Sequence, residues 1–460
     1  MQLKTVKFKK KNLAVLVAAF IIIGSVLLFK IYAAGPEASF EAENASLTGS
    51  VSVGNDVNAS GGRFIQFANT TTGGGGGTLN TTFTDTAAFP EPAWNNSTNH
   101  EGGRVDAIRR VGDTIYVGGN FTVAQDTSTS TNVTRNYLAA INASTGKLLP
   151  WNPDANGRIY DIEPSADGST LYVAGSFSTI GGVTRHGLAA LDPVTGAVKS
   201  SLPDMNFNSF VWVIRIYGNT LYAGGQFSGG IAKIDLSTSP ASRVSSWNPT
   251  FNGSGSSPVK DIVLVPGTNR LVVGGWFTSA NGSSTSYITA IDSGGNGASL
   301  SWSSHPGQPV LNLDYYAPNN TLLAGTVSDT VTSFNATTGA ENWALHTDGN
   351  VQAITIFGNS VIAGMHGDCI AGKPGEAAVR YQNSNTCKSS GTPDGLVRHK
   401  IFKIDAATGI PDNNWGPSLN GGTSLGVWAL DADTGAVYGG GDFVTVDGQS
   451  QPRFVKFVTH

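Results

Sequence analysis

The stretch from Leu171 to Phe177 reads Leu-Tyr-Val-Ala-Gly-Ser-Phe, and close variants of it return along the chain about every 50 residues. Seven copies can be read, at residues 115–121, 171–177, 221–227, 271–277, 321–327, 361–366 and 437–443. A short apolar strand that recurs at a fixed period cannot bury both of its faces alone and must stack on its neighbours. The period therefore predicts a β-propeller with seven blades.

Each repeat is expected to supply four strands, and the second repeat shows them at residues 159–163, 171–177, 188–192 and 197–201. A tight hairpin is predicted at Asp192 to Gly196, because an Asp bonds its own backbone and a Gly accepts positive φ. The fourth strand of most repeats ends at a Trp, as at Trp151 and Trp247. A large ring repeated once per unit predicts packing between neighbouring blades.

The last repeat shows strands at residues 427–431, 437–443 and 454–457 but no fourth strand. The segment Thr86 to Asn96, ahead of the first repeat, matches the missing piece. We therefore expect this N-terminal segment to complete the last blade and close the ring, which removes exposed strand edges.

Further motifs accompany the repeated strand: Arg-x-x-Leu-Ala-Ala-Leu-Asp, then Thr-Gly and Trp-Asn-Pro. Arg135 to Ala140 and Arg185 to Ala190 show the first of these motifs closely. The combination resembles the delta-60 repeat and the propellers of the cortical marker for cell polarity family, over nearly all of residues 78–460. The resemblance implies a surface or secreted propeller without an established reaction, and so it implies no catalytic residues.

The N-terminus carries lysines from Lys7 to Lys11, followed by an uncharged apolar run from Leu13 to Phe29. Its length predicts a transmembrane helix that anchors the protein in the cell membrane with the propeller outside. A cleaved signal peptide is the alternative, and it would make the protein secreted. The predicted parts are a cytoplasmic tail at 1–12, the transmembrane segment at 13–34, an exported β-rich stub at 35–69, a Gly/Thr linker at 70–77 and the propeller at 78–460.

Within the stub, Phe40 to Asn44 and Ala59 to Phe67 resemble the opening strands of family 6 carbohydrate-binding modules. The resemblance stops after about 30 residues. The strands that carry the sugar-contacting loops of such modules do not follow, so no sugar site is implied for the stub.

The net charge of −4 supplies no basic field for a phosphate backbone, so nucleic acid is not expected as a partner. Cys369 and Cys387 are the two cysteines of the chain. In an exported protein they are expected to form a disulfide that staples one loop, and two thiols are too few for a metal site. We expect a monomer that needs no cofactor.

When the first strands of the seven repeats are aligned, the first and fourth positions are always aliphatic, which predicts that these side chains are buried in the core. The second position varies and lies near the mouth of the central channel, on the face that also carries the long loop from Met365 to Arg398. We expect a ligand-binding surface there. Its predicted members are Trp212, Trp428 and Tyr160 for stacking and Asp106, Lys260 and Gln352 for polar contacts. Ordinary packing between blades is the alternative.

The sequence shows no catalytic motif, and we assign neither a catalytic residue nor a metal ligand. His366 and His399 bracket the expected disulfide loop, with Asp368 nearby. A metal site of these three residues is conceivable, but the two histidines are interpreted as solvated side chains of a polar loop. Asp161 and Glu163 lie in one strand but carry no motif of glycoside hydrolysis.

These features favour a non-enzymatic binding or adhesion module at the cell surface for a glycan, a peptide or a partner protein. A quinoprotein-like oxidoreductase is one alternative, because Asn335 to Trp343 is similar to the repeats of quinone-dependent dehydrogenases. Those enzymes generally have eight blades, and many carry adjacent cysteines, which this chain lacks. A polysaccharide-active enzyme is the other alternative and would need paired carboxylates in the channel.

Overall fold

The computed structural model describes residues 51–55, 63–67, 79–80, 103–126, 131–253, 259–303, 305–327, 329–376, 379–383, 386–389, 395–420 and 426–459. The chain divides into two compact units, Met1–Gly75 and Gly76–His460. In the first unit, β1 (Val51–Asn55) and β2 (Arg63–Phe67) pair as an antiparallel hairpin. The second unit holds the other described strands.

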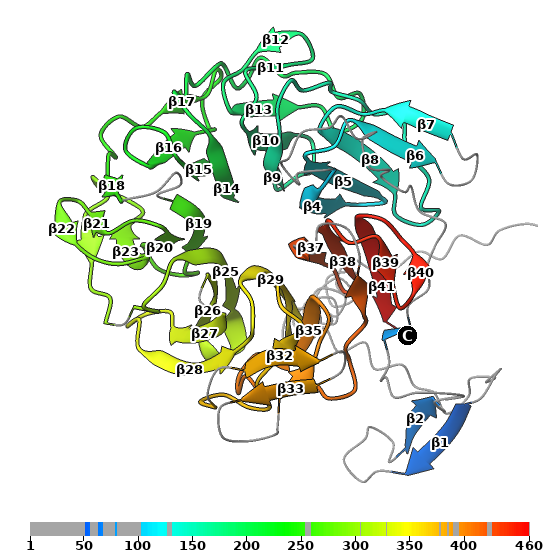
Figure 1. The fold of residues 1–460 in the computed structure, drawn as a ribbon. Coiled ribbons are helices and arrows are strands. Elements are labelled where there is room, and N and C mark those ends of the chain that lie inside the picture. The colour runs from blue at the N-terminus through cyan, green and yellow to red at the C-terminus, as the bar shows by residue number, and fades with distance from the viewer. Residues whose placement is uncertain are drawn as a thin grey trace, which may run out of the picture. The chain divides into compact units, whose positions relative to one another are not determined.

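Antiparallel sheets in the second unit stand around a common centre, as the blades of a propeller do (Figure 1). Their innermost strands are β4 (Val105–Val111), β9 (Ile159–Pro164), β14 (Val211–Tyr217), β19 (Val259–Leu264), β25 (Val310–Tyr316), β29 (Val351–Phe357) and β37 (Val427–Ala432). Each of these strands contacts the innermost strand on either side, and β37 contacts β4. The described residues therefore form a closed ring of seven sheets.

The second strands of the sheets are β5 (Thr114–Gly119), β10 (Leu171–Gly175), β15 (Thr220–Gly225), β20 (Arg270–Gly275), β26 (Thr321–Thr326), β30 (Ser360–Met365) and β38 (Ala436–Gly441). The third strands are β8 (Leu138–Asn142), β13 (Leu188–Leu191), β16 (Ile231–Asp235), β23 (Ile288–Asp292), β27 (Thr330–Asn335), β35 (Ile401–Asp405) and β41 (Phe454–Thr459).

Fourth strands are less regular than the sequence predicted. Four sheets have one: β17 (Ser242–Arg243), β24 (Ser299–Leu300), β28 (Glu341–His346) and, in the last sheet, β3 (Leu79–Asn80). In the other three sheets, isolated bridges stand at this place, from Ile141 to Leu148, from Leu191 to Val198 and from Ile404 to Pro411. The expected fourth strand at 197–201 is thus reduced to one bridge.

An N-terminal strand completes the last sheet, but it is not the predicted one. β3 pairs with β41, with Leu79 opposite Thr459 and Asn80 opposite Val458. The segment Thr86 to Asn96, expected in this place, lies outside the described residues. Our prediction followed a Trp-Asn packing motif, whereas the edge of β41 is paired through backbone groups that almost any residue carries.

The predicted fold class is wrong in its transmembrane helix. The structure describes an all-β fold with one short 3-10 helix, η3 (Ala317–Asn319), and no described helix is long and apolar enough to cross a membrane. The segment expected to span the membrane, residues 13–34, lies outside the described part of the chain.

The core lies between neighbouring sheets, where the repeated Trp packs as predicted. Trp151 meets the ring of Tyr116 edge-on with 5.0 Å between centroids, and its Nε1 donates to the carbonyl oxygen of Asp192 in the next blade at 3.2 Å. Trp247 repeats this arrangement and donates to the carbonyl oxygen of Asp292 at 2.9 Å. Each Trp therefore fixes the Asp-x-x-Thr-Gly type of hairpin, or its equivalent, against the blade before it.

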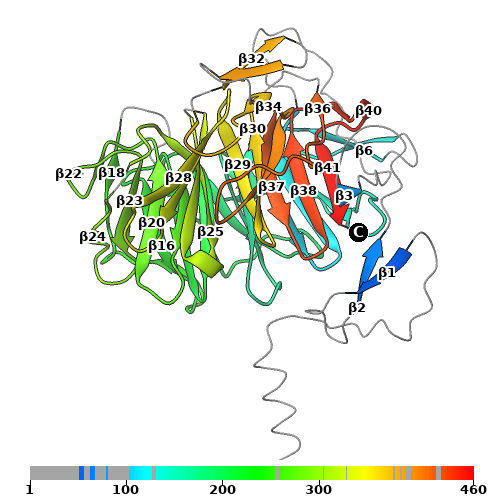
Figure 2. The same cartoon turned by 90° about the horizontal axis from the view of Figure 1, so that it is seen from below.

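Short outer hairpins between the second and third strands lie on one side of the ring (Figure 2). The largest insertion carries β31 (Cys369–Ile370), β32 (Val379–Asn383), β33 (Thr386–Ser389) and β34 (Leu396–Val397). The expected disulfide between Cys369 and Cys387 is confirmed, and it ties β31 to β33.

Candidate functional site

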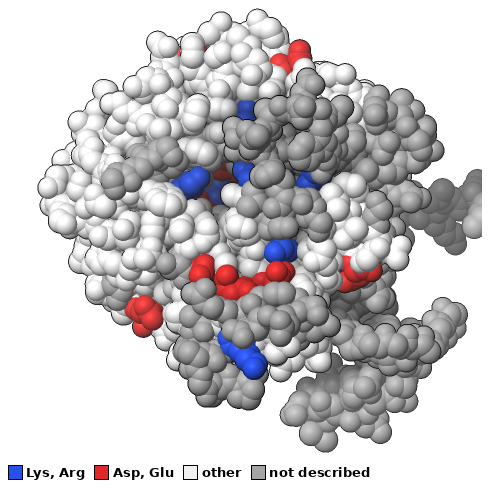
Figure 3. Space-filling view, in the orientation of Figure 1, with Lys and Arg blue, Asp and Glu red and all other residues white. Residues whose placement is uncertain are grey.

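A cavity of about 410 Å³ lies at the centre of the ring and is lined by all seven innermost strands. On the face shown in Figure 3, lysine and arginine side chains are visible inside the central hollow. All six residues of the predicted binding surface line this one cavity: Asp106, Tyr160, Trp212, Lys260, Gln352 and Trp428. The structure thus brings them together, while their role in binding stays a prediction.

A β-bulge explains why these side chains face the cavity. In every innermost strand, the register against the second strand shifts so that the second aligned residue has no partner. A bulge of this kind leaves one residue out of the ladder and re-aims its side chain. The second, third and fifth positions therefore line the cavity together, whereas simple alternation would expose only the third and fifth.

Asp106 is the centre of a charged cluster at the start of the strands. Its carboxylate accepts hydrogen bonds from Arg104 Nε at 2.6 Å and from Arg158 at 2.7 and 2.8 Å. The Arg104 guanidinium lies 3.6 Å from the ring centroid of Trp428, and the Arg158 guanidinium lies 5.1 Å from that of Tyr160. One carboxylate thus holds two guanidinium groups against two aromatic faces.

An aromatic ledge stands beside this cluster. Tyr160 stacks on Trp212 with 3.9 Å between centroids, and Phe210 lies 6.3 Å from each of the two rings. Phe210 is 40% exposed, whereas most large apolar side chains of the described residues are buried. The ledge therefore offers an apolar surface at the rim of a polar cavity.

Sequence reasoning missed Arg104, Arg158 and Phe210. All three stand one residue before the aligned strands, at β4, β9 and β14 respectively. Extending the alignment by one position would have found them, since this position is next to the bulge and opens toward the same mouth.

Lys260 adds a third basic group to the mouth. Its Nζ lies 3.4 Å from the ring centroid of Trp212. Burial lowers the pKa of Lys260 to about 7, with repulsion from Arg104 adding to the effect and attraction to Asp106 opposing it. We define the channel mouth as Arg104, Asp106, Arg158, Tyr160, Phe210, Trp212, Lys260 and Trp428. Its basic side chains outnumber its acidic ones.

Two indole nitrogens of the mouth add unused donors. The Nε1 atoms of Trp212 and Trp428 are buried, and neither donates a hydrogen bond to the described part of the chain. A buried donor without a partner costs free energy. An acceptor from a ligand would remove that cost.

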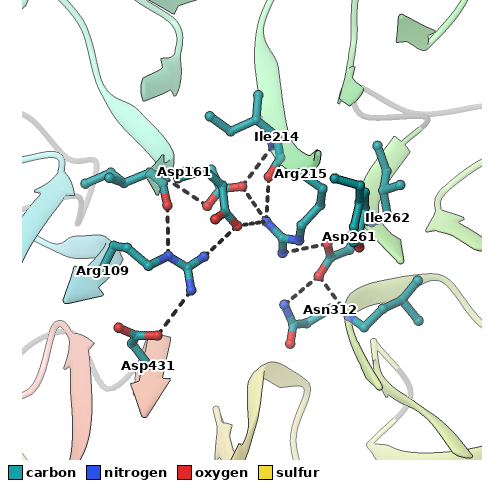
Figure 4. A network of polar contacts seen from close by, with 12 residues as sticks. Arg109, Asp161, Ile214, Arg215, Asp261, Ile262, Asn312 and Asp431 are labelled. Atoms are coloured by element: carbon teal, nitrogen blue, oxygen red, sulfur yellow. Dashed lines mark hydrogen bonds and ion pairs between the residues drawn. The ribbon is translucent and has the colours of Figure 1, made fainter. Parts of the chain in front are cut away.

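Below the mouth, arginines and carboxylates form a second network (Figure 4). Arg215 donates to Asp161 and Asp261, both at 2.7 Å, and to Glu163 at 3.2 Å. Arg109 donates to the same Glu163 oxygen at 2.7 Å. Burial raises the pKa of Glu163 to about 7 and that of Asp261 to about 6, although the neighbouring guanidinium groups oppose both shifts.

These carboxylates also bridge neighbouring blades. Asp261 Oδ2 accepts from the backbone N–H of Leu313 on the next innermost strand at 2.9 Å. Asp314 accepts from the N–H of Ile356 at 2.9 Å in the same way. Asp161 likewise accepts from the backbone N–H of Ile214, and Asp431 accepts from that of Arg110. The inner edge of each of these strands would otherwise leave its N–H groups unpaired, so the acidic residues join the blades.

Of the two histidines expected to be solvated near the disulfide, His399 is in fact paired. His399 Nδ1 lies 3.1 Å from Asp368 Oδ1, and Lys400 Nζ lies 3.2 Å from the same oxygen. Among the described residues no group of three or more His, Cys, Asp or Glu side chains could hold a metal ion. Asp368 is therefore engaged in a local ion pair.

One comparison with known proteins identifies the type of repeat. The family model described as a domain of unknown function (DUF5122) β-propeller matches residues 268–295. The chain carries a propeller-type repeat. A computationally designed protein, Ika8, is similar in structure at 15% identity and a TM-score of 0.44, over 78% of this chain and 98% of that one. Among curated proteins, none matches the chain.

Proposed function

We propose that this propeller is a non-enzymatic binding module that holds an acidic saccharide at the channel mouth. We also propose that the protein is exported, since a buried disulfide is typical of oxidising compartments outside the cytoplasm. It also takes the repeats to be of the delta-60 type, which the match over residues 268–295 supports only as far as a propeller repeat.

One observation carries the proposal: at the channel mouth, three basic side chains and an aromatic ledge face the cavity with a single acidic residue, Asp106, between them. The other carboxylates that line the cavity are bonded within the deeper network: Asp161, Glu163, Asp261 and Asp314. A carboxylated sugar presents both a charge and an apolar ring face. Guanidinium groups bind carboxylates through charge-assisted hydrogen bonds. Tyr160, Trp212 and Phe210 supply the apolar surface against which a sugar ring packs.

The deeper carboxylates favour binding over hydrolysis. Glycoside hydrolysis needs one carboxyl as an acid and another as a nucleophile or base, both free to reach the substrate. Asp161 and Glu163 instead share the guanidinium of Arg215, and Asp161 also accepts a backbone N–H of the next blade. These bonds join neighbouring innermost strands and so stabilise the closed ring.

The test is titration calorimetry of the full chain with galacturonate oligomers, and with neutral galactose oligomers of the same length as the control ligand. We expect binding of the acidic oligomer that weakens as salt rises, because the mouth is partly open to solvent. Phe210→Ala and Arg158→Gln should each lower the affinity by about tenfold, which corresponds to roughly 1.4 kcal/mol.

Val194→Ala serves as the matched control, because Val194 is 83% exposed and does not line the cavity. It should leave the affinity unchanged. Equal binding of acidic and neutral oligomers would contradict the role of the basic groups. Full affinity in both mouth variants would remove the mouth as the site.

A further inference from the structure

Lys260 differs from the other partly buried lysines of the described chain. Its Nζ makes no hydrogen bond or ion pair to any described residue and lies over the face of Trp212. The others donate to oxygen atoms: Lys199, Lys233, Lys400, Lys403 and Lys456. The amine of Lys260 is therefore held at the cavity without an acceptor.

The surroundings of Lys260 disfavour its charged form. Arg104 repels the ammonium group, and Asp106, the acid of the mouth, is already bonded to two guanidinium groups. On the neighbouring strand β25, the titratable residues that line the cavity are Asp314 and Tyr315, but the charges that shift the pKa of Lys260 are those of Arg104 and Asp106. On its own strand, Asp261 is engaged by Arg215.

The face of Trp212 favours the ammonium form, whereas burial and Arg104 oppose it. The balance lowers the pKa to about 7, so roughly half of the amine is uncharged at neutral pH. An ordinary exposed lysine is almost fully charged there. Lysines with this combination of burial and a neighbouring cation act as nucleophiles toward carbonyl groups.

We infer that Lys260 is a covalent capture site, at which the amine condenses with the aldehyde group of a small anionic ligand to form an imine. The amine nitrogen bonds to the carbonyl carbon, both amine hydrogens pass to the carbonyl oxygen, and that oxygen leaves as water. The step is redox-neutral and needs no further reactant. It goes beyond the proposed saccharide binding and does not depend on it.

The rest of the mouth fits an aldehyde that carries a negative charge. Arg104 and Arg158 stand at the same cavity and can hold a carboxylate while Lys260 reacts with the carbonyl group. A volume of about 410 Å³ is in the range of small-molecule sites. The ligand class is thus a small aldehyde acid.

The test treats the folded full chain with glyoxylate and cyanoborohydride at pH 7, which fixes the imine as a carboxymethyl amine. Peptide mapping by mass spectrometry then measures the modification rate at each lysine and at the N-terminal amine. We expect Lys260 to react at least tenfold faster than the exposed Lys373, and its rate to level off above about pH 8. The rate at Lys373 should keep rising with pH.

Two variants control the assignment. Lys260→Arg keeps a cation over Trp212 and should abolish the fast adduct, while Lys373→Arg should leave it unchanged. Acetaldehyde, which has no charge, should react with Lys260 more slowly than glyoxylate does. Unfolding in guanidinium should remove the difference between lysines. Equal rates at Lys260 and Lys373 in the folded protein would overturn the inference.

Discussion

Replacing Arg215 by Met should destabilise the propeller more than an ordinary loss of an ion pair. Arg215 is 20% exposed and bonds three carboxylates, of which Asp261 is 1% exposed. Removing one partner of a buried ion pair leaves the other charge uncompensated and typically costs about 3–5 kcal/mol. We therefore expect the free energy of unfolding at pH 7.5 to fall by about that amount.

Arg110→Met is the matched control. Arg110 lies on an innermost strand too, but its side chain is 32% exposed and its partner Asp433 is 26% exposed, so we expect a loss of about 1 kcal/mol or less. Both free energies are measured by guanidinium denaturation, followed by fluorescence and by circular dichroism, so that coincident curves establish two-state unfolding. Equal losses in the two variants would refute the view that Arg215 balances buried charge.

The same network predicts a pH dependence of known sign. The folded pKa values of Glu163 and Asp261 lie above their unfolded values, so the folded state binds more protons between about pH 4 and 7. Stability contributed by these two groups is present at low pH and falls as pH rises through that window. The loss of unfolding free energy caused by Arg215→Met should accordingly be smaller at pH 5 than at pH 7.5, because the carboxylates left unpaired take up protons. A deficit that grows on acidification would contradict this reasoning.

Two further predictions concern local structure. Gly339 has φ of +76°, and a Cβ there would stand 2.4 Å from the Trp302 ring, whereas a Cβ at Gly358, with φ of +58°, meets no atom within 4 Å. Gly339→Ala should therefore lower the free energy of unfolding by about 1 kcal/mol more than Gly358→Ala, which carries the left-handed strain alone. Reducing the Cys369–Cys387 disulfide, which closes 18 residues, should cost about 3 kcal/mol in the chain-entropy model and speed proteolysis of β32 and β33. Unchanged cleavage after reduction would show that the disulfide does not hold this insertion.

The sequence predicted the repeated strand because each blade must bury the same apolar positions. Leu171 and Val173 are fully buried against the neighbouring sheet, as their periodic apolar character indicated. The disulfide followed equally well from two cysteines in one loop of a chain that the sequence predicts to be exported. The position of the closing strand β3 could not be predicted from the sequence, because the pairing of Leu79 with Thr459 uses backbone groups and leaves no side-chain signal.

What the sequence by itself determined is the propeller-type repeat and the set of variable residues at the second position of each innermost strand. Only the tertiary structure decided that a bulge turns this position toward the cavity, since a register shift depends on the partner strand and not on the residue. It alone also showed that Arg109 and Arg215, far apart in the chain, share one carboxylate of Glu163. Ring closure brings distant strands together, and a local pattern cannot encode which charges then meet.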